Sequence, residues 1–528
     1  MSVNFTIRHC KYQELPLYGK NHLFSWLDDG VTPSPFFKKG TDPSGLSSFS
    51  SFMDREHLSH ILRVYNTEYG YNGDERIWDD IAKDACFIVS GHQPVLMTGP
   101  LYIFYKAVSI IALARELQKR CPYRIIPLFW VAAEDHDIME VNHFYFNGMR
   151  FTFKYEAPLI TGQVPQVADI SLVQCRDLLL QFLDSHMPES EFSPWVRDMI
   201  ASSSFDNYAS LFISLLIKLF SAWGLIVVNP LWIRSLTSQV LAHMVDGWGD
   251  ASESLVKGGE ILKKHRFSPP LNRLGIFEIV NGKRKALSFS EDGIIFDHGK
   301  CSFTEGAERI KENPDSFSGN VALRPIVQDA VIPCLLTVGG PSELLYLWQI
   351  SPLYDVMHIT RSSIFPRISG TIIENKIKRI LLKMNMYDQL PSIFSKDSTI
   401  LNDRRPKVDM NPDIMKIEES VKEMMAAIGK VSAGKENKRW VEKEKDMIEK
   451  RIVKLISRLK EEELEEIGLG KSRLERIKNA LIPGGKPQER VANIFQYLVL
   501  YGPDFIEASL ESLDPFSLQH HLVEIESA

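Results

Sequence analysis

The chain has 528 residues, of which 44% are hydrophobic and 24% are charged, and its formal net charge is −6. This length favours about two or three domains with sizeable cores. Because the net charge is small and negative, the composition argues against a general nucleic-acid binder and against binding to anionic membranes. It leaves room for a local basic pocket.

The N-terminal segment and the cysteines bear on the cellular compartment. Residues 1–16 contain no basic region followed by an apolar run, which predicts no signal peptide. No stretch reaches the roughly 18 uninterrupted apolar residues of a membrane span. The cysteines are scattered without a C-x-x-C pair: Cys10, Cys86, Cys121, Cys175, Cys301 and Cys334. This spacing favours reduced thiols in the cytoplasm over a disulfide framework or a zinc site, so no zinc is expected.

The first clear pattern along the chain is a strand, a helix and a second strand. Residues 86–90 form a short apolar run, and a turn-rich loop over 91–99 leads into an amphipathic helix over about 100–120. Residues 124–132 form a second apolar run. Such a crossover makes the two strands parallel, so the loops that follow them open at one edge of a sheet, where ligands of α/β proteins bind.

Later segments extend this α/β core and interrupt it. Residues 144–153 predict a hairpin that turns at Asn147-Gly148, and 224–228 and 330–338 predict further buried strands. The predicted organisation is a first core part (1–143), an inserted hairpin and helical region (144–222), a core strand and helix (223–257), a small β-rich insertion (258–304), a second core part (305–400), an antiparallel coiled-coil arm (401–482) and a C-terminal segment returning to the core (483–528).

The coiled-coil arm is predicted from a heptad seam. Apolar residues are spaced 3-4-3-4-3 at Ile414, Ile417, Val421, Met424, Ile428 and Val431. A second, charged helix over about 436–466 carries its own apolar seam, which Lys445 interrupts. The segment is too narrow to form its own core, so it either folds on itself or pairs with a second copy.

The strongest candidate for chemistry follows the second strand. Glu134, Asp135, His136 and Asp137 crowd three carboxylates and an imidazole, with Glu140 and His143 just beyond. Crowded charges are costly unless they are solvated or bind something, and their place after a buried strand favours binding over a polar helix cap. His136 could act as a general base or contact a phosphate, and Asp135 or Asp137 could orient it or hold Mg²⁺.

A second candidate follows the first strand. His92 could carry a proton or contact a phosphate, and the amide of Gln93 could fix a substrate group. The alternative is a structural histidine. We expect this histidine-bearing turn to face the acidic loop across one crevice.

Two predicted helix starts at the same edge offer anion sites. One, at Gly99-Pro100, is followed by Tyr102 and by Lys106, which could neutralise an anion or be a solvated surface lysine. The other, at Gly339-Gly340, carries Glu343. That carboxylate could cap its own helix or receive a substrate ammonium.

Known motifs leave two further interpretations open. The sequence has no H-E-x-x-H, no G-x-x-x-x-G-K-[ST] and no G-x-G-x-x-G, so a nucleotide would bind by another scheme. A metal-dependent hydrolase of an amide or phosphoester could use His92, Asp135, His136 and His143. The other interpretation is a non-catalytic scaffold whose functional part is the coiled-coil arm.

Several blocks resemble one known family. The runs VSGHQPVLMTGPLYIFYKAVSIIALA and IIPLFWVAAEDHDIMEVNHFYF are similar to the signature of the bacillithiol biosynthesis cysteine-adding enzymes. LRPIVQDAVIPCLLTVGGPSELLYLWQI, FPRISGTIIE and PGGKPQERVANIFQYLVLYGPDFI are similar to further blocks of that family, in the same order. The resemblance spans about 90–506.

The resemblance implies a fold, a reaction and an assembly. The fold would be a Rossmann-like, nucleotidyltransferase-type parallel sheet interrupted by connecting-peptide insertions, with a coiled-coil domain that forms a homodimer. The reaction would be the ligation of L-cysteine to the amine of glucosaminyl malate, giving the thiol bacillithiol. ATP with Mg²⁺ would activate the cysteine carboxylate, either as an acyl-adenylate or as an acyl-phosphate.

The residue patterns described above and the resemblance together give the candidate site residues. The catalytic candidates are His92, Asp135, His136 and Asp137. Those on the nucleotide side are Gly91, Gln93, Gly99, Lys106, Gln488 and Arg490, and those on the substrate side are Glu134, Asn142, Gly339, Gly340 and Glu343. The sequence departs from the family pattern at His92, where a Thr-Gly-Gln-Gln opening is usual, at Asn229, where an acidic residue is common, and near 265–270. These departures bear on substrate recognition.

Overall fold

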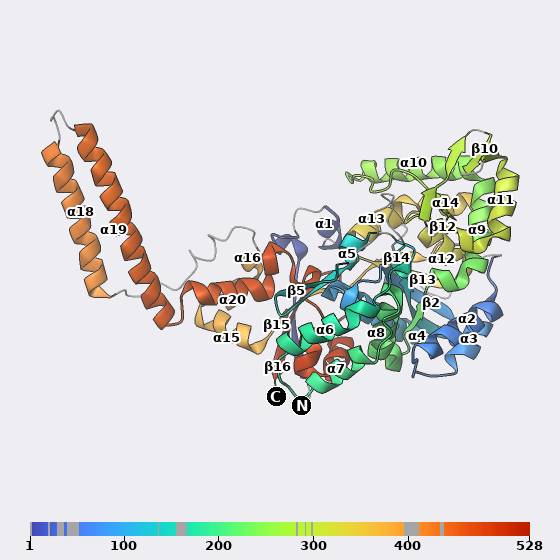
Figure 1. Ribbon diagram of the computed structural model, residues 1–528, viewed down its shortest axis with the longest axis horizontal. Coiled ribbons are helices and arrows are strands. Elements are labelled where there is room, and N and C mark those ends of the chain that lie inside the picture. The colour runs from blue at the N-terminus through green and yellow to red at the C-terminus, as the bar shows by residue number, and fades with distance from the viewer. Residues whose placement is uncertain are drawn as a thin grey trace. The chain divides into compact units, whose positions relative to one another are not determined.

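The computed structural model describes residues 3–18, 22–28, 36–39, 52–135, 137–154, 166–280, 283–290, 292–296, 299–394, 411–432 and 438–527 (Figure 1). The chain forms two compact units. The larger comprises Met1–Glu14, Tyr18–Thr371 and Gln488–Ala528, and the smaller comprises Leu15–Leu17 and Ile372–Pro487. Within the described ranges, no helix is both long and apolar enough to cross a membrane.

The larger unit is built on a parallel sheet of five strands. In spatial order these are β14 (Ser363–Pro366), β13 (Cys334–Gly339), β2 (Cys86–His92), β3 (Ile125–Val131) and β6 (Ile226–Val228). Numbered along the chain, the order is 3-2-1-4-5, which is that of a Rossmann-like fold. The predicted fold class is confirmed. The order reverses between β2 and β13, which is where such folds bind ligands.

The predicted strand–helix–strand unit is present. Strands β2 and β3 pair in register from Cys86 with Ile125 to His92 with Val131, and α4 (Leu101–Gln118) connects them. Nearly every residue of α4 is buried, rather than one face as expected from the sequence. The reason is that η10 (Gln488–Arg490) and α22 (Asp504–Ser512) pack against α4.

Insertions separate the remaining core strands. The predicted hairpin is confirmed as β4 (His143–Phe146) and β5 (Met149–Thr152), and both turn residues have positive φ, 48° at Asn147 and 80° at Gly148. Helices α6 (Val173–His186), α7 (Ser193–Ala201) and α8 (Tyr208–Phe220) follow it.

The second insertion differs from its predicted start. Helix α9 (Arg234–Asp246) is followed by α10 (Trp248–Lys264), so the β-rich part begins only at β7 (Ile276–Val280), not at residue 258. Strands β7, β8 (Lys283–Ala286) and β12 (Phe317–Gly319) form one small sheet. Strands β9 (Ser288–Ser290), β10 (Gly293–Phe296) and β11 (Gly299–Cys301) form another.

The chain ends form a sheet that the sequence did not predict. Strand β1 (Val3–Cys10) pairs antiparallel with β16 (His520–Ser527), and β15 (Ser369–Ile373) completes the sheet. Only one residue of β1 is buried, so the strand lacks a clear apolar period, and its partner lies at the other end of the sequence.

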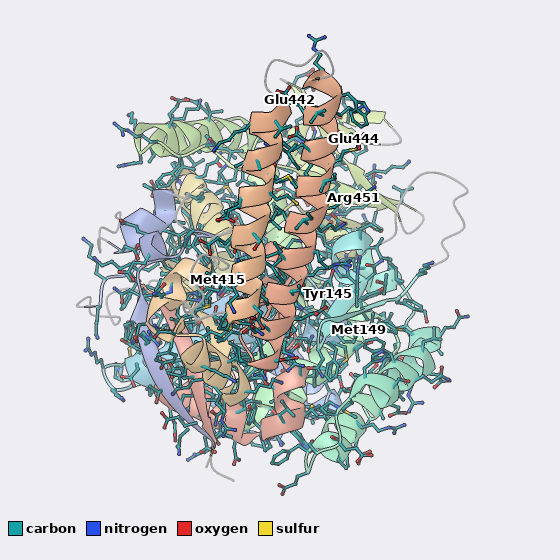
Figure 2. The ribbon with its side chains drawn as sticks, turned by 90° about the vertical axis from the view of Figure 1, so that its left-hand side faces the viewer. Tyr145, Met149, Met415, Glu442, Glu444 and Arg451 are labelled. Atoms are coloured by element: carbon teal, nitrogen blue, oxygen red, sulfur yellow. The ribbon has the colours of Figure 1, made fainter. Side chains whose placement is uncertain are left out.

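The smaller unit is helical. Helix α15 (Asn375–Lys383) packs with α20 (Lys471–Leu481), and α18 (Pro412–Ser432) lies beside α19 (Lys438–Glu466) as the predicted antiparallel pair (Figures 1 and 2). Half of the predicted heptad seam of α18 does not face α19. Ile414, Val421 and Ile428 are half-buried, whereas Ile417, Met424 and Val431 are 45%, 43% and 66% exposed.

Candidate active site

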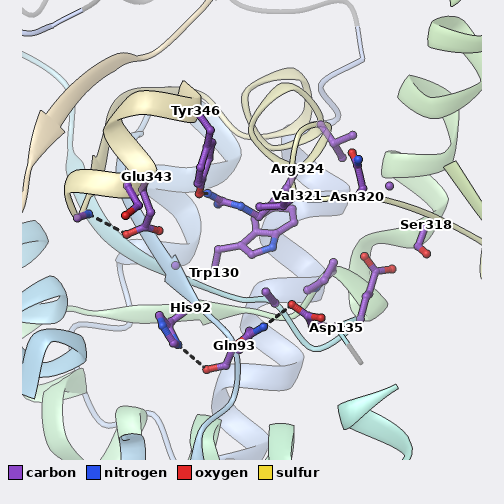
Figure 3. A pocket seen from close by; sticks show the side chains of 18 of the residues that line it. His92, Gln93, Trp130, Asp135, Ser318, Asn320, Val321, Arg324, Glu343 and Tyr346 are labelled. Carbon is purple, nitrogen blue, oxygen red and sulfur yellow. Dashed lines mark hydrogen bonds between the residues drawn. The ribbon is translucent and has the colours of Figure 1, made fainter. Parts of the chain in front are cut away.

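A cavity of about 380 Å³ lies at the carboxyl edge of the central sheet, where the strand order reverses (Figure 3). Its polar walls come from the ends of β2 and β3, from the start of α13 (Pro341–Gln349) and from several cationic side chains, of which those of Lys106 and Arg367 are buried. The residues that line it include two glycines and many polar side chains: Gly91, His92, Gln93, Tyr102, Lys106, Glu134, Asp135, Glu140, Arg284, Arg324, Gly340, Ser342, Glu343, Tyr346, Arg367 and Arg490.

The histidine-bearing turn at the end of β2 packs closely against β3, and both ring nitrogens of His92 are in hydrogen-bonding contact. A side-chain carbon on Gly91 would come within 2.7 Å of the carbonyl oxygen of Trp130, so only glycine fits against β3 there. The Nδ1 of His92 lies 3.0 Å from the carbonyl oxygen of Gln93, and its Nε2 lies 2.9 Å from the hydroxyl of Tyr102. A carbonyl oxygen only accepts, so Nδ1 carries the proton and Nε2 accepts from Tyr102.

His92 is neutral at physiological pH. Burial, together with the nearby positive charge of Lys106, lowers the pKa of His92 to about 4. A neutral imidazole with this pKa is a weak base and brings no positive charge to a phosphate.

The acidic loop after β3 meets this turn, as the sequence predicted. The Nε2 of Gln93 donates a hydrogen bond to the Oδ2 of Asp135, and both residues line the cavity with Glu140 (Figure 3). Burial and the negative charges of Asp137 and Asp135 raise the pKa of Glu140.

Other candidates from this loop lie elsewhere. Asp137 is exposed and is not part of the cavity wall. Asn142 is buried outside it, and its Oδ1 lies 3.2 Å from the Nδ1 of His143. His136 lies outside the described residues.

Glu134 is bound by arginines. Its carboxylate pairs with the guanidinium of Arg234 at 3.2 Å, and its backbone carbonyl accepts a hydrogen bond from Arg284 at 3.0 Å. Burial raises the pKa of Glu134, while Arg234 and Arg284 oppose that rise. In this arrangement, Glu134 ties the loop after β3 to two later elements of the chain.

The start of α13 opens into the cavity. The Oε2 of Glu343 accepts from the backbone N–H of Gly340 at 2.7 Å and pairs with the Nζ of Lys106 at 2.7 Å. Lys106 also donates to the carbonyl of Gly91 at 2.7 Å, and its side chain is only 1% exposed, so it is not a solvated surface lysine. Burial favours the neutral form of Glu343, but Lys106 and the N–H of Gly340 outweigh it and lower the pKa of Glu343.

The start of α4 does not offer the anion site that the sequence suggested. The N–H of Leu101 donates to the carbonyl of Ala492, and the side-chain amide of Asn493 donates to the carbonyls of Met97 and Gly99. The C-terminal segment therefore occupies this helix end. Gly99 is absent from the cavity wall, and so are Gln488 and Gly339, whereas Arg490 is part of it.

Comparison with known proteins decides the family. The description "Bacillithiol biosynthesis BshC, N-terminal Rossmann-like domain" matches residues 37–368, and "Bacillithiol biosynthesis BshC, C-terminal coiled-coil domain" matches residues 370–525. The chain belongs to the bacillithiol biosynthesis BshC family. This confirms the resemblance seen in the sequence blocks.

Relatives with the same family name match nearly the whole chain. Proteins named "Putative cysteine ligase BshC" from Bacillus cereus strain ATCC 10987 and Bacillus thuringiensis strain Al Hakam are each 26% identical to this BshC family member, covering 96% of both chains. The protein is an enzyme of the ligase type. The match to a solved structure described as a "putative arginyl t-RNA synthetase" from Campylobacter jejuni covers 89% of this chain and 98% of that chain, at 11% identity and a TM-score of 0.21, which is too low to show a shared fold.

Sequence reasoning missed the arginines of this BshC site. Arg324 donates to the hydroxyl of Tyr346 at 3.1 Å and to the side chain of Gln328 at 3.0 Å. Arg367 forms two hydrogen bonds with Glu489, at 3.0 and 2.8 Å. Both arginines lie in sequence blocks that resemble the family, so those blocks could have marked them as candidates. No residue pattern showed that their side chains reach the cavity.

Sequence reasoning also missed Glu489, which binds one of these arginines. The sequence pointed to its neighbours Gln488 and Arg490, yet Glu489 is the residue of this segment that binds Arg367. A buried glutamate in a polar stretch gives no local sign of its partner, which lies 122 residues earlier in the chain.

The metal-dependent hydrolase gains no support from the described part of the BshC site. His92 is engaged with Gln93 and Tyr102, and His143 with Asn142. Among the residues that the structure describes, no three histidine, cysteine or acidic side chains gather as metal ligands.

Proposed function

We propose that this BshC family member is an ATP-using ligase that joins the carboxyl group of L-cysteine to the amine of glucosaminyl malate, forming bacillithiol. The observation that carries the proposal is the match of both family domains over nearly the whole chain. A polar cavity at the point of a Rossmann-like sheet where ligands bind supports it.

Amide formation sets the chemical requirements. A carboxylate does not react with an amine until one carboxyl oxygen becomes a good leaving group, which ATP would supply as an adenylate or a phosphate. The new C–N bond then forms as that C–O bond breaks, and the attacking ammonium group must first lose a proton.

The cavity has separate places for these needs. The start of α13, with Arg324 and Arg367 nearby, offers N–H donors and positive charge to oxyanions. Glu140 offers a carboxylate to an ammonium group, and Asp135 would hold Mg²⁺, which needs only one or two protein carboxylates.

The proton acceptor in this proposal belongs to the acidic loop rather than to His92. A carboxylate with a raised pKa is a stronger base than an ordinary one, and Glu140 meets that description. The neutral His92 instead accepts a hydrogen bond from Tyr102 and fixes that hydroxyl on the cavity wall.

The decisive experiment is mass spectrometry of the products formed from ATP, Mg²⁺, L-cysteine and glucosaminyl malate. Bacillithiol that forms only with both the protein and ATP supports the proposal, and the release of AMP or of ADP identifies the activation step. Wild-type protein that is folded and gives no bacillithiol would overturn it.

A matched pair of variants tests the acidic loop. Asp135→Asn keeps the size of the side chain but removes its charge, so we expect the ligation rate to fall about 100-fold. Asp198→Asn, on the exposed surface of α7, serves as the control and leaves the rate unchanged. Equal rates for both variants would remove Asp135 from the mechanism.

We further propose a homodimer formed through the arm, in the cytoplasm. The exposed seam residues Ile417, Met424 and Val431 of α18 support pairing with a second copy. Light scattering of the full chain should give twice the monomer mass, and Ile417→Lys with Met424→Lys should reduce it to that of a monomer. The six free cysteines fit a reducing compartment.

A further inference from the structure

Arg367 carries one N–H group that no described residue accepts. The residue is 6% exposed. Its Nη1 donates to the carbonyl of Ile368 and to Glu489, and its Nη2 donates to Glu489, at 2.7, 3.0 and 2.8 Å. The Nε is buried and has no hydrogen-bond partner among the residues described. Buried donors are nearly always satisfied, so an exception on a cavity wall points to a missing acceptor.

This N–H lies beside the start of α13. A side-chain carbon built on Gly340 would lie 3.6 Å from the Nε of Arg367, and Gly340, Ser342 and Arg367 all line the cavity. At the start of α13 the N–H of Gly340 is hydrogen-bonded to Glu343, and Pro341 has no N–H. The first-turn N–H groups of Ser342 and Glu343 lack a backbone acceptor within the helix, so they form its positive end. Two independent kinds of donor therefore lie on the same part of the cavity wall.

The charges around this point leave a net positive charge. Arg367 is paired with Glu489, and Lys106 with Glu343. Arg490 lines the same cavity, is exposed, and forms no ion pair with any residue that the structure describes. The carboxylate of Glu343 would also lie close to an incoming anion, but Lys106 and the N–H of Gly340 already compensate its charge.

We propose that the Nε of Arg367, the start of α13 and Arg490 together form an oxyanion subsite. Its ligand is an oxyanion of the reactants, either a phosphate group of ATP or a carboxylate of the malyl group. The choice of these two reactants rests on the proposed function. Glu489 is a positioning residue, because it holds two nitrogens of the guanidinium and thereby fixes the third beside Gly340.

The test is isothermal titration of the full-length protein with two probes, inorganic pyrophosphate and L-malate. Gly340→Ala places a methyl group beside the Nε of Arg367, and its φ of −77° is one that alanine adopts readily. We expect about tenfold weaker binding of the probe that uses the subsite, since a hydrogen bond to a charged group is worth that much. Gly247→Ala is the control, because nothing lies within 4 Å of its new carbon.

Arg490→Gln provides a second route to the same answer. The side chain is exposed, so its loss should not affect folding, and we expect about threefold to tenfold weaker binding of the same probe. Weakening of pyrophosphate alone identifies a phosphate subsite, and weakening of malate alone identifies a carboxylate subsite. If the wild type binds neither probe, or both variants bind both probes as tightly as the wild type, the subsite is refuted.

The ligation assay separates this proposal from the proposed function. If the wild type forms no bacillithiol while Gly340→Ala still weakens probe binding, the function is wrong and the subsite stands. If Gly340→Ala forms bacillithiol with unchanged kinetic constants, the subsite is wrong and the function stands.

Discussion

Helices α4 and α13 start with the same local motif, but only the start of α13 is open to the cavity. Each follows a central strand, starts at a Gly-Pro pair and lies beside the point where the strand order reverses. The start of α4 is closed by Ala492 and Asn493, whereas the start of α13 opens into the cavity. A shared local motif therefore specifies a helix start but does not specify whether a ligand can reach it.

The two helices are also joined. Lys106 of α4 pairs with Glu343 of α13 and at the same time donates to Gly91. This lysine ties the closed helix to the open one across the edge of the sheet. The difference between the two helix starts can be tested with three kinds of variant. One removes Asn493, which closes the start of α4, one removes Lys106, which joins the helices, and one replaces the glycine at each helix start.

Removing the side chain that closes the start of α4 should have the largest effect on stability. Asn493 is fully buried, and its side chain makes three hydrogen bonds, to the carbonyls of Met97 and Gly99 and from the N–H of Phe495. Asn493→Ala leaves these groups unsatisfied, so we expect a loss of about 3 kcal/mol in the free energy of unfolding. Urea denaturation followed by tryptophan fluorescence measures it.

The control for this variant is Asn313→Ala. Asn313 is exposed, and its side-chain amide makes one hydrogen bond to the carbonyl of Arg309. We expect a change below about 0.5 kcal/mol. A similar small change for Asn493→Ala would mean that the C-terminal segment does not hold the start of α4.

Breaking the Lys106–Glu343 pair that joins the two helices should have the second-largest effect on stability. Lys106→Met removes the buried ammonium group and leaves the carbonyl of Gly91 without its donor, so we expect the free energy of unfolding to fall by about 2 kcal/mol. Lys119→Met, at the exposed end of the same helix, should stay within about 0.5 kcal/mol of the wild type. Equal stability of the two variants would show that the Lys106 pair is not needed.

The two glycines should behave oppositely. Gly99 has φ +65°, and a side-chain carbon there would lie 2.9 Å from Ile103 and 3.0 Å from Val95, so Gly99→Ala should cost about 1.5 kcal/mol. Gly340→Ala should leave the melting temperature unchanged, because its backbone and surroundings accept a methyl group. Destabilisation by Gly340→Ala equal to that by Gly99→Ala would contradict the distinction between the helix starts.

The change of pH should alter the stabilisation by the Lys106–Glu343 pair only slightly, which is the smallest of the expected effects. The folded pKa of Glu343 lies below its ordinary 4.5, so the unfolded chain binds more protons in that range, and this contribution to stability is lost as the pH falls below about 4.5. We expect the stability difference between wild type and Lys106→Met to be largest above pH 5 and to shrink toward pH 3. A difference that stays constant over this range would show that Glu343 does not depend on Lys106.

Much of the architecture was predictable because it depends on local patterns. Apolar runs predicted β2, β3, β6 and β13, the pair Asn147-Gly148 predicted the hairpin turn, and heptad spacing predicted α18. The parallel arrangement of β2 and β3 followed from the crossover between them, and with it the meeting of Gln93 and Asp135.

The missed features depend on partners that are distant in the sequence. Strand β1 acquires its pattern only by pairing with β16, and Lys106 is buried because it contacts Gly91 at the end of β2 and Glu343 at the start of α13. The exposed half of the α18 seam was likewise invisible, since heptad spacing does not say how many helices will cover it.

The sequence by itself carried the blocks that resemble the family. It also determined four of the five core strands and the two polar loops after β2 and β3, because hydrophobic periodicity and turn chemistry act over a few residues. The tertiary structure alone decided which helix start faces the cavity, and that Arg324, Arg367 and Glu489 complete it. Burial and ion pairing join residues far apart along the chain, so no local pattern records them.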